Sequence, residues 1–440
     1  MPDVQVTIDR LAFGGNGVAR INGKVCFVPF SCPGDELAVR VVSEKRSYLT
    51  AAITRVIRPG ADRVTPPCPL FGLCGGCNWQ HVAYERQLSE KQAIFSDTLW
   101  RGARVSAEKI GAIVPAPSTY GYRKRVQFKL GATKSGLRIG FYRTASHYAE
   151  DVGEGCSVAT REVNAALFNL RGILSSFPEP DKIPQINIDA TERTAVAIVN
   201  YTGADKDGIA AFFERYRSQL GDISGLYLRC GKKSFLQKIY GDDLLEYFLP
   251  GDSDGKSRYS LVYKPGDFAQ TNSVQNAAIL AIIRNFANAA AHDRILDLYC
   301  GNGNFSLPLA GSVSHVTGIE ECSGSVESAR ENARRNGNVN AEFLCATAAL
   351  GLRRLAEEGR PYSTVILDPP RTGAADALFE LLRLGPEKII YVSCDPASLA
   401  RDCGILIAGG YDAERCVPVD MFPQTHHLES VTLLRRRTKI

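Results

Sequence analysis

The first 58 residues contain short runs in which apolar and polar positions alternate, a pattern typical of β-strands. The runs lie at 4–8, 25–28, 37–42 and 49–56, and glycine-rich turns separate them. Four or five closely spaced strands are too few for a β-sandwich. They predict a small closed β-barrel of the oligonucleotide-binding kind over residues 1–58.

Residues 59–265 mix helical and strand patterns. Apolar residues at helical spacing predict a helix over 84–99, and period-two alternation predicts strands at 123–130, 185–188 and 195–199. This mixture predicts an antiparallel α+β central domain. Within the strand at 123–130, the same period places Arg123, Arg125, Gln127 and Lys129 on one face. Such a face suits phosphate groups, and a strand face in contact with solvent only is the alternative.

From residue 266 to residue 440 the chain alternates between strand and helix patterns. A helix is predicted at 275–288, and strands at 294–298, 316–320, 364–368 and 388–393. This alternation predicts a doubly wound parallel sheet. Since ligands bind outside the carboxyl ends of the strands in such sheets, the residues that end each strand are the candidates for chemistry.

Composition changes this picture little. The chain has 440 residues, of which 45% are hydrophobic and 22% charged, so it is long enough for two or three domains and too balanced to be disordered. No apolar stretch approaches the ~18–20 residues of a membrane span. The first 20 residues carry acids and glycines where a signal peptide has an apolar core. We therefore expect a cytoplasmic protein with no membrane partner.

The net charge of +5 is too dilute over this length to indicate a polyanionic partner, but the basic residues are clustered. Residues 109–148 contain no acid, and the chain ends on a second basic run. The basic residues of the two clusters are Lys109, Arg123, Lys124, Arg125, Lys129, Lys134, Arg138 and Arg143, and then Arg435, Arg436, Arg437 and Lys439.

The 13 cysteines are not interpreted as a disulfide framework, since cytosolic thiols stay reduced. Three of them, Cys68, Cys74 and Cys77, lie within ten residues, with glycines that let the backbone curl around one centre. Cys156, also in a glycine-rich turn, is a candidate fourth ligand. The spacing suits zinc or an iron–sulfur cluster and does not choose between them. A redox pair is disfavoured because no strand–helix pattern precedes the cysteines.

The predicted strand ends carry several reactive or polar residues. The first parallel strand enters a loop with two glycines, Asp297-Leu298-Tyr299-Cys300-Gly301-Asn302-Gly303-Asn304-Phe305, and Glu320 ends the next strand. An acid at this place pairs the hydroxyls of an adenosine ribose. The loop and the acid resemble motifs of S-adenosylmethionine-dependent methyltransferases, with NAD as the alternative cofactor. Asp368 precedes Pro369-Pro370-Arg371, and Cys394 precedes a predicted helix, whose N-terminus stabilises a thiolate.

Taken together, the five motifs Gly266–Asn272, Asp297–Phe305, Asp368–Arg371, Ser393–Pro396 and His427–Ser430 resemble those of RNA uracil-C5 methyltransferases. At the N-terminus, Phe13-Gly14-Gly15-Asn16-Gly17-Val18-Ala19-Arg20 resembles a TRAM domain, a small RNA-binding barrel. This resemblance to the ribosomal RNA branch of the family implies that Cys68, Cys74, Cys77 and Cys156 hold a [4Fe-4S] cluster. It also implies S-adenosylmethionine as cofactor and 23S ribosomal RNA as substrate.

The resemblance also implies a role for each candidate residue. The thiolate of Cys394 adds to carbon 6 of uracil, and Glu429 removes the proton from carbon 5 after methylation. Gln270 and Asp368 orient uracil and cofactor, and Phe268 packs at their junction. Tyr299, Asn304 and Glu320 hold the cofactor. We expect the protein to act as a monomer.

Three alternatives stay open. The same reaction would act on the T-loop uridine of transfer RNA. Amino-group methylation of a nucleic-acid base would need no cysteine. A non-catalytic RNA-binding or electron-transfer protein is disfavoured because Cys394 and Glu429 are both present.

Overall fold

The computed structural model describes residues 3–133, 136–144, 146–191, 194–231, 236–251 and 258–438. Lys134 and Lys439, two of the basic residues singled out above, lie outside the described residues. The chain forms two compact units. The first comprises residues 1–94, 118–242 and 422–427, and the second comprises residues 95–117, 243–421 and 428–440. Within the described ranges, no helix has the length and apolar character needed to cross a membrane.

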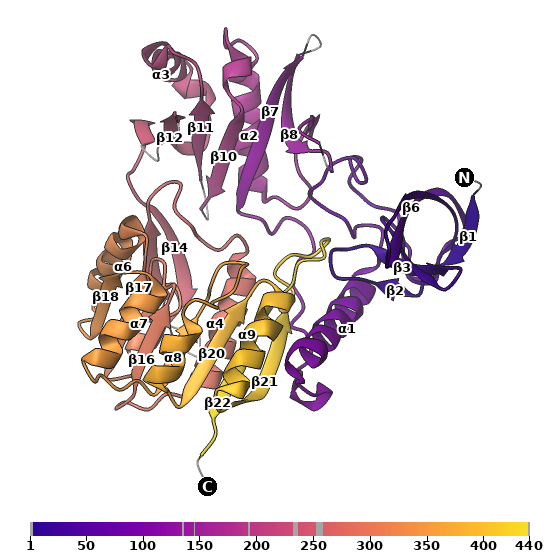
Figure 1. The fold of residues 1–440 in the computed structure, drawn as a ribbon. Helices are drawn as coiled ribbons and strands as arrows, with labels where there is room; N and C mark the ends of the chain where they lie inside the picture. The colour runs from indigo at the N-terminus through magenta and orange to yellow at the C-terminus, as the bar shows by residue number, and fades with distance from the viewer. Residues whose placement is uncertain are drawn as a thin grey trace. The chain divides into compact units, whose positions relative to one another are not determined.

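The first unit begins with a curled six-stranded sheet that forms the predicted barrel (Figure 1). Its strand order is β1-β5-β6-β4-β3-β2, and its interior is filled by apolar side chains from all the longer strands. The prediction missed the two strands that flank the glycine-rich turn at 14–17, because runs this short and interrupted carry little periodic signal. The strands are β1 (Val4–Thr7), β2 (Arg10–Leu11), β3 (Gly17–Ile21), β4 (Lys24–Val28), β5 (Glu36–Glu44) and β6 (Tyr48–Arg58).

A seven-stranded sheet forms the rest of the first unit, in the order β13-β12-β11-β10-β7-β8-β9. Apolar side chains on one face pack against helix α2 (Arg161–Leu174), and α3 (Lys206–Arg215) contributes to the same core. The strands are β7 (Arg125–Thr133), β8 (Gly136–Tyr142), β9 (Ala149–Asp151), β10 (Gln185–Ala190), β11 (Ala195–Tyr201), β12 (Ile223–Cys230) and β13 (Leu236–Tyr240). Short 3-10 helices lie at Pro180–Lys182 and Arg217–Gln219.

The expectation of a purely antiparallel central sheet is wrong at one pair. Strands β11 and β12 are parallel, and all the other pairs of this sheet are antiparallel. The reason is the connection between them. Helix α3 lies between the two strands in the chain, and a strand–helix–strand crossover returns the second strand in the same direction as the first.

The second unit contains the predicted doubly wound sheet, in the order β18-β17-β16-β19-β20-β22-β21 (Figure 1). The first five strands are parallel, and β22 and β21 complete the sheet in antiparallel pairs. The strands are β16 (Arg294–Leu298), β17 (His315–Glu320), β18 (Ala341–Cys345), β19 (Thr364–Leu367), β20 (Lys388–Ser393), β21 (Tyr411–Val419) and β22 (Glu429–Arg436). This confirms the fold class expected for the C-terminal part of the chain.

Helices accompany this sheet, and a hairpin precedes it in the chain. The core of the unit includes Phe95 and Leu99 from the second half of α1 (Tyr84–Ala103), which continues from the first unit into the second. The other helices are α4 (Ser273–Ala287), α5 (Leu307–Ala310), α6 (Ser323–Arg335), α7 (Ala348–Glu357), α8 (Leu378–Leu384) and α9 (Pro396–Ala408), with a 3-10 helix at Ala107–Lys109. The hairpin pairs β14 (Leu245–Pro250) with β15 (Arg258–Tyr263).

The six residues 422–427 belong to the first unit, although the chain on both sides of them belongs to the second. Gln87, fully buried on α1, holds this segment. Its side-chain amide donates to the carbonyl of Trp79 at 3.1 Å, the carbonyl of Val82 at 2.8 Å and Oε1 of Gln424 at 3.0 Å, and it accepts from the backbone N–H of Gln424 at 2.9 Å. Asn78 accepts from the N–H of His426 at 3.0 Å. The segment that precedes Glu429 is therefore anchored by buried hydrogen bonds.

Candidate active site

Four neighbouring strand ends carry the predicted reactive residues of the second unit. Strands β17, β16, β19 and β20 are parallel neighbours, so their carboxyl ends lie at one edge of the sheet. Tyr299, Glu320, Asp368 and Cys394 lie at or just beyond these ends. Strand β22 runs the other way and begins at the same edge with Glu429. The strand order reverses between β16 and β19, which is where doubly wound sheets bind their ligands.

Cys394 and Glu429 each lie one residue beyond the last paired residues of the neighbouring strands β20 and β22. Ser393, the last residue of β20, pairs with Ser430 of β22 in antiparallel register. One further step along that register puts Cys394 opposite Glu429, and directly opposed residues have Cβ atoms about 5 Å apart. Glu429 is buried and Cys394 is half-buried. The fold therefore joins a thiol and a carboxyl group that are 35 positions apart in the sequence.

The thiol of Cys394 and the carboxyl groups of Glu429 and Asp368 lie near one another in a poorly solvated environment. Burial, followed by the neighbouring Glu429 and Asp368, raises the pKa of the Cys394 thiol to about 12. Burial and Asp368 raise the pKa of Glu429 well above its usual value, and burial raises that of Asp368 to about 7. In the free protein at neutral pH, Cys394 is thus a neutral thiol, and the surroundings of Glu429 favour its protonated form.

This finding is opposite to the stabilised thiolate expected from the helix that follows Cys394. The N-terminus of α9 is capped by Asp395, whose carboxylate accepts the N–H groups of Ala397 at 3.0 Å and Ser398 at 2.8 Å. These N–H donors therefore bond Asp395 and not the sulfur of Cys394, and the cap adds a negative charge to the positive end of the helix dipole.

Arg371 is the cation of this site, and sequence reasoning assigned it no role. Its guanidinium group lowers the pKa of both Cys394 and Glu429, against the larger effect of burial. The signal that was available is its position, directly after Asp368-Pro369-Pro370 at a strand end. A charged residue at that point in a doubly wound sheet faces the ligand edge.

Asp402, fully buried on α9, ties down the loop that carries Arg371. Its Oδ2 accepts from the hydroxyl of Tyr391 at 2.6 Å and from the N–H of Ala374 at 2.8 Å. Arg401 donates to Oδ1 of Asp402 at 2.8 Å and to the carbonyl of Thr372 at 2.7 Å. The loop after Asp368 and the helix after Cys394 are thus held together by one carboxylate.

The loop after β16 leaves room for a bound molecule. Gly301 has φ +56°, and a Cβ placed on it would meet no atom within 4 Å. Beside it, Glu320 accepts the N–H of Gly301 at 3.2 Å and that of Cys322 at 2.8 Å, which leaves further lone pairs on this carboxylate. The hydroxyl of Tyr299 is buried and has no hydrogen-bond partner among the described residues. An open cradle, a carboxylate and an orphaned hydroxyl fit the sugar and polar groups of a nucleoside cofactor.

Asn304 is more committed to the protein than the sequence suggested. Its Oδ1 accepts from Nδ2 of Asn276 at 2.9 Å and lies 3.1 Å from the hydroxyl of Tyr247, and its Nδ2 donates to Oδ1 of Asn276 at 3.0 Å. The side chain thus ties the glycine-containing loop to α4 and β14. One amide N–H is left for a ligand.

The residues before α4 combine an exposed ring with two amides. Phe268 is 71% exposed, Gln270 is half-buried, and Asn272 caps α4 by accepting the N–H of Gln275 at 3.3 Å. Asn272 also donates to the carbonyl of Met421 at 3.0 Å. A ring of this size left in solvent is available for stacking on a planar partner.

The four predicted cysteine ligands lie close together in the first unit. Each of the thiols of Cys68, Cys74, Cys77 and Cys156 interacts electrostatically with the other three. All four side chains are half-buried. In the parts of the chain that the structure describes, no three His, Cys, Asp or Glu side chains are arranged to hold a metal ion. The structure thus gathers the four thiols without a preformed single-ion site.

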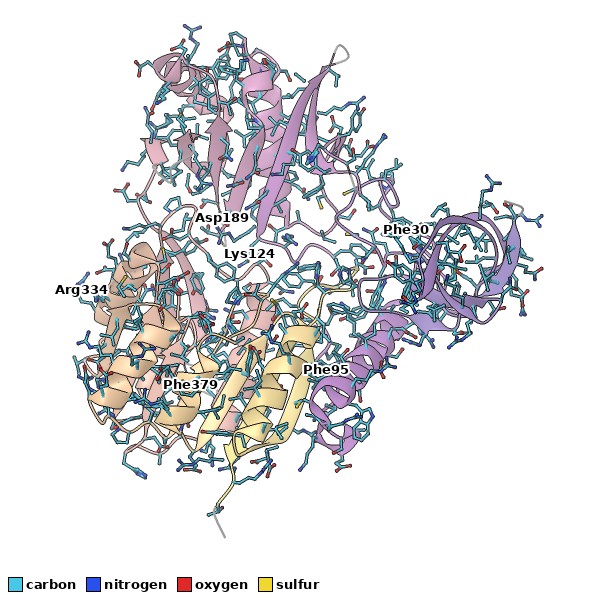
Figure 2. The ribbon with its side chains drawn as sticks, in the orientation of Figure 1. Phe30, Phe95, Lys124, Asp189, Arg334 and Phe379 are labelled. Carbon is cyan, nitrogen blue, oxygen red and sulfur yellow. The ribbon has the colours of Figure 1, made fainter. Side chains whose placement is uncertain are left out.

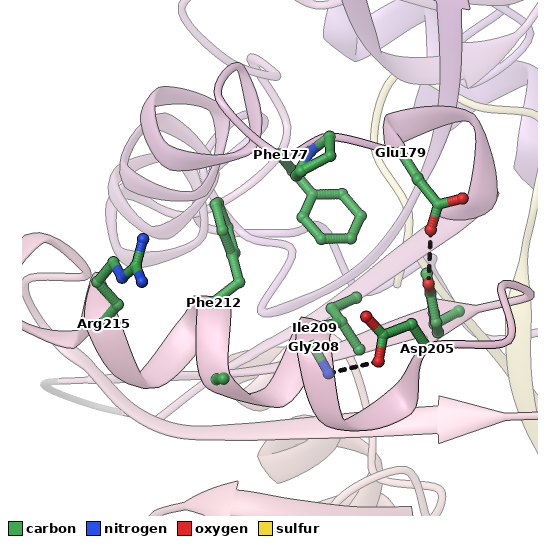
Figure 3. Close-up of a pocket in the computed structure, with 10 residues that line it drawn as sticks. Phe177, Glu179, Asp205, Gly208, Ile209, Phe212 and Arg215 are labelled. Carbon is green, nitrogen blue, oxygen red and sulfur yellow. Dashed lines mark hydrogen bonds between the residues drawn. The ribbon is translucent and has the colours of Figure 1, made fainter.

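A separate pocket of about 330 Å³ lies beside α3 in the first unit and contains none of the predicted site residues (Figure 3). The rings of Phe177 and Phe212 line it, with centroids 5.0 Å apart. At its rim, Glu179 accepts from the hydroxyl of Tyr201 at 3.1 Å, and Asp205 accepts the N–H of Gly208 at 2.8 Å (Figure 3). Both carboxylates are thus engaged in bonds within the protein.

Comparison with known families finds two matches. Residues 231–437 match the family described as tRNA (Uracil-5-)-methyltransferase, and residues 3–54 match the TRAM domain. The second match covers the barrel.

Full-length relatives were also found. The chain is 33% identical to a 23S rRNA (uracil(1939)-C(5))-methyltransferase of Alkalilimnicola ehrlichii, over 99% of this chain and 97% of that protein. It is 34% identical to a protein of the same name from Pseudomonas aeruginosa, over 98% and 93%. An uncharacterised RNA methyltransferase of Thermosynechococcus vestitus is 33% identical over 98% and 97%.

Among solved structures, a Pyrococcus abyssi tRNA (uracil-54, C5)-methyltransferase in complex with S-adenosyl-L-homocysteine superposes with a TM-score of 0.72. The alignment covers 98% of this chain and 100% of that one, at 24% identity. At this level of identity the likeness concerns the fold.

The raised pKa of Cys394 predicts slow alkylation of the free protein. Below a thiol pKa of about 12, each pH unit changes the thiolate fraction about tenfold. Iodoacetamide should therefore modify the exposed Cys322 and Cys345 first, and the rate at Cys394 should keep rising up to pH 10. Peptide mass spectrometry measures each site. In Arg371→Ala the rate at Cys394 should fall, since the guanidinium group favours the thiolate. A rate that levels off near pH 8 contradicts the assigned environment.

Proposed function

The chain belongs to the family of RNA uracil-5-methyltransferases, and on that premise we propose that it methylates carbon 5 of a uridine in 23S ribosomal RNA, with S-adenosylmethionine as methyl donor. The observation that carries the proposal is the nearness of Cys394 and Glu429, which interact electrostatically just beyond the Ser393–Ser430 pair at the ligand edge of the sheet. The relatives named as 23S ribosomal RNA enzymes support this substrate, because they match nearly the whole chain. A TRAM domain at the N-terminus supports an RNA substrate.

The cofactor would occupy the edge formed by the ends of β16 and β17. Glu320 would bind the ribose hydroxyls with the lone pairs left after its two backbone bonds, and Tyr299 and Asn304 would contribute a hydroxyl and an amide N–H. When bound, S-adenosylmethionine supplies an electrophilic methyl group and a positive charge that favours the ionised forms of nearby acids.

Cys394 would start the reaction. Carbon 5 of uracil is a poor nucleophile, so the sulfur of Cys394 adds to carbon 6 and the electron pair of the 5,6 double bond moves into an enolate. The thiol proton passes to water before the bond forms, so the thiolate is the attacking form. Gln270 and Asp368 would orient the ring during the addition, and Phe268 would pack against the planar partner.

Glu429 would complete the reaction. After carbon 5 has taken the methyl group, it still carries its proton. The carboxylate of Glu429 removes this proton, the electron pair re-forms the double bond, and the bond between sulfur and carbon 6 breaks. Burial and Asp368 disfavour the carboxylate form of Glu429 that this step needs, and Arg371 favours it.

The four gathered cysteines would hold a [4Fe-4S] cluster. Such a cluster takes one thiolate at each iron, and the four mutually interacting thiols support this assignment. With all four irons bound by protein thiolates, no iron is free for a substrate. We therefore assign the cluster a supporting or RNA-positioning role.

The reaction predicts the behaviour of Cys394→Ala. The wild-type protein should transfer labelled methyl groups from S-adenosylmethionine to undermodified 23S ribosomal RNA as 5-methyluridine, and the rate in Cys394→Ala should fall at least about a thousandfold. Cys230→Ala, which changes a cysteine of the first unit, is the matched control and should stay active. Nucleoside analysis identifies the product.

Other products decide between the alternatives. Methylated transfer RNA without methylated ribosomal RNA would move the substrate to the T-loop uridine. A methylated amino group, or methylation by Cys394→Ala, contradicts the cysteine mechanism and supports amino-group methylation.

The cluster proposal predicts a joint loss in Cys77→Ser. Iron and acid-labile sulfide should fall to background, and the free energy of unfolding and the affinity for RNA should fall with them, because the cysteine loops lose their common centre. Cys230→Ser is the control. Elemental analysis, denaturant unfolding and RNA binding measure the three quantities. A Cys77→Ser protein that loses iron yet folds and binds RNA normally contradicts the supporting role.

A further inference from the structure

The central sheet of the first unit has one face covered by helix and one polar face. Val126 and Phe128 of β7 point into the core with α2. The intervening residues Gln127 and Lys129 lie on the opposite face, and the register of β10 places Asn187 and Gln185 beside them. Gln127 is exposed, and the other three are half-buried.

Strand β8 extends this face with cationic and aromatic side chains. Arg138 pairs with Gly131, and Tyr142 lies on the same side as Lys129, whose Nζ is 5.5 Å from the centroid of the tyrosine ring. Figure 2 labels Asp189 and Lys124, which lie at one end of this sheet. We call the set the basic sheet face, comprising Gln127, Lys129, Arg138, Tyr142, Gln185 and Asn187 with the adjoining Arg143 and Tyr148.

Two arginines converge on one exposed ring. The guanidinium carbons of Arg138 and Arg143 lie 4.7 Å and 4.5 Å from the centroid of Tyr148, which is 40% exposed. Stacking on an aromatic ring holds a guanidinium group in place and leaves its N–H donors at the rim. Arg138 forms no salt bridge within the described ranges, although its charge helps to lower the pKa of Asp151. Arg143 uses its Nε on Glu150 and keeps its terminal donors.

The acids near this face are already neutralised. Glu150 is buried against Arg143, and Asp189 is buried against Arg125 at 2.5 Å. Asp151 is paired with Arg171 at 2.6 Å. The face therefore presents positive charge, amides and rings, which is the combination that binds the phosphates and bases of single-stranded RNA.

We propose that the basic sheet face is a binding surface for single-stranded RNA, with backbone phosphates at Arg138 and Arg143 and base edges at Gln127. The inference rests on the proposed function in taking RNA as the partner. A target uridine must leave any base stack to be methylated, which favours a single-stranded segment as the bound form.

The cysteine loop is attached to this face. The N–H of Gly75 donates to the carbonyl of Tyr142 at 3.0 Å, and Cys74 bridges to Arg143 through the backbone. A Cβ on Gly75 would lie 2.9 Å from that carbonyl, so only glycine fits. The end of β8, which positions Arg143, is thus held by the loop that carries three of the four cysteines.

The test measures binding of a fluorescein-labelled single-stranded RNA oligonucleotide to the full chain by anisotropy, as a function of salt. Arg138→Ala and Tyr148→Ala should each raise Kd about three- to tenfold. Removing one phosphate-binding cation should lower the slope of log Kd against log salt by about 0.7. Tyr148→Phe keeps the ring and should bind as the wild type does. Arg217→Ala removes another stacked arginine, 4.3 Å from the ring of Tyr240 beside the helix-covered core, and should change Kd less than about twofold.

Thermal melting confirms that each variant is folded. The inference is overturned if folded Arg138→Ala and Tyr148→Ala keep the Kd and salt slope of the wild type. It is also overturned if Arg217→Ala loses as much RNA affinity as they do, because net charge alone would then determine binding. The assay needs no methyl transfer. If the wild type makes no 5-methyluridine while Arg138→Ala still loses RNA binding, the proposed function fails and the RNA surface stands.

Discussion

The proposed chemistry depends on one electrostatic constraint, namely that a thiol and two carboxyl groups share a poorly solvated edge of the sheet with a single guanidinium group. Cys394, Glu429 and Asp368 each disfavour ionisation of their neighbours, and burial adds to this effect. In the free protein these effects favour the thiol form of Cys394 and the protonated form of Glu429. Added positive charge, such as that of a sulfonium cofactor, would favour the ionised forms of these groups.

The fold creates this constraint through one antiparallel pair in a sheet whose other central pairs are parallel. Strand β22 lies beside β20 and runs in the opposite direction. Its first residue, Glu429, therefore lies next to the last residues of β20. Residues 422–427, which end one residue before β22, are anchored in the first unit by Gln87 and Asn78. The start of the strand that carries Glu429 is thus covalently joined to the unit that contains the TRAM match and the gathered cysteines.

Much of the fold follows from sequence patterns because strand periodicity and strand–helix alternation are local. The predicted bounds of β16 and β20 agree with the observed ones, and the reactive residues collect at strand ends as doubly wound sheets require. The raised pKa of the Cys394 thiol did not follow from these local patterns. A helix N-terminus lowers a thiol pKa only where its donors are free, and Asp395 occupies them here. The direction of the shift depends on neighbours that only the tertiary fold supplies.

Other features that the sequence did not predict also depend on contacts that only the tertiary fold supplies. The network that commits Asn304 to Asn276 and Tyr247 joins residues far apart in the chain, so no local pattern reports it. The parallel pairing of β11 with β12 depends on the crossover through α3. The nearness of Cys156 to the other three cysteines was inferred from a glycine-rich turn and the resemblance, and its electrostatic interaction with them agrees with that inference.

The most direct measurement of the central claim is a covalent trap. RNA in which 5-fluorouridine replaces uridine carries a fluorine that Glu429 cannot remove as a proton, so a Cys394 adduct that has accepted the methyl group cannot break down. After incubation with S-adenosylmethionine and denaturation, peptide mass spectrometry should find methylated fluorouridine attached to Cys394, and none in Cys394→Ala. Absence of any adduct in a wild-type protein that methylates uridine RNA, or an adduct at another residue, would contradict the assignment of Cys394 as the nucleophile.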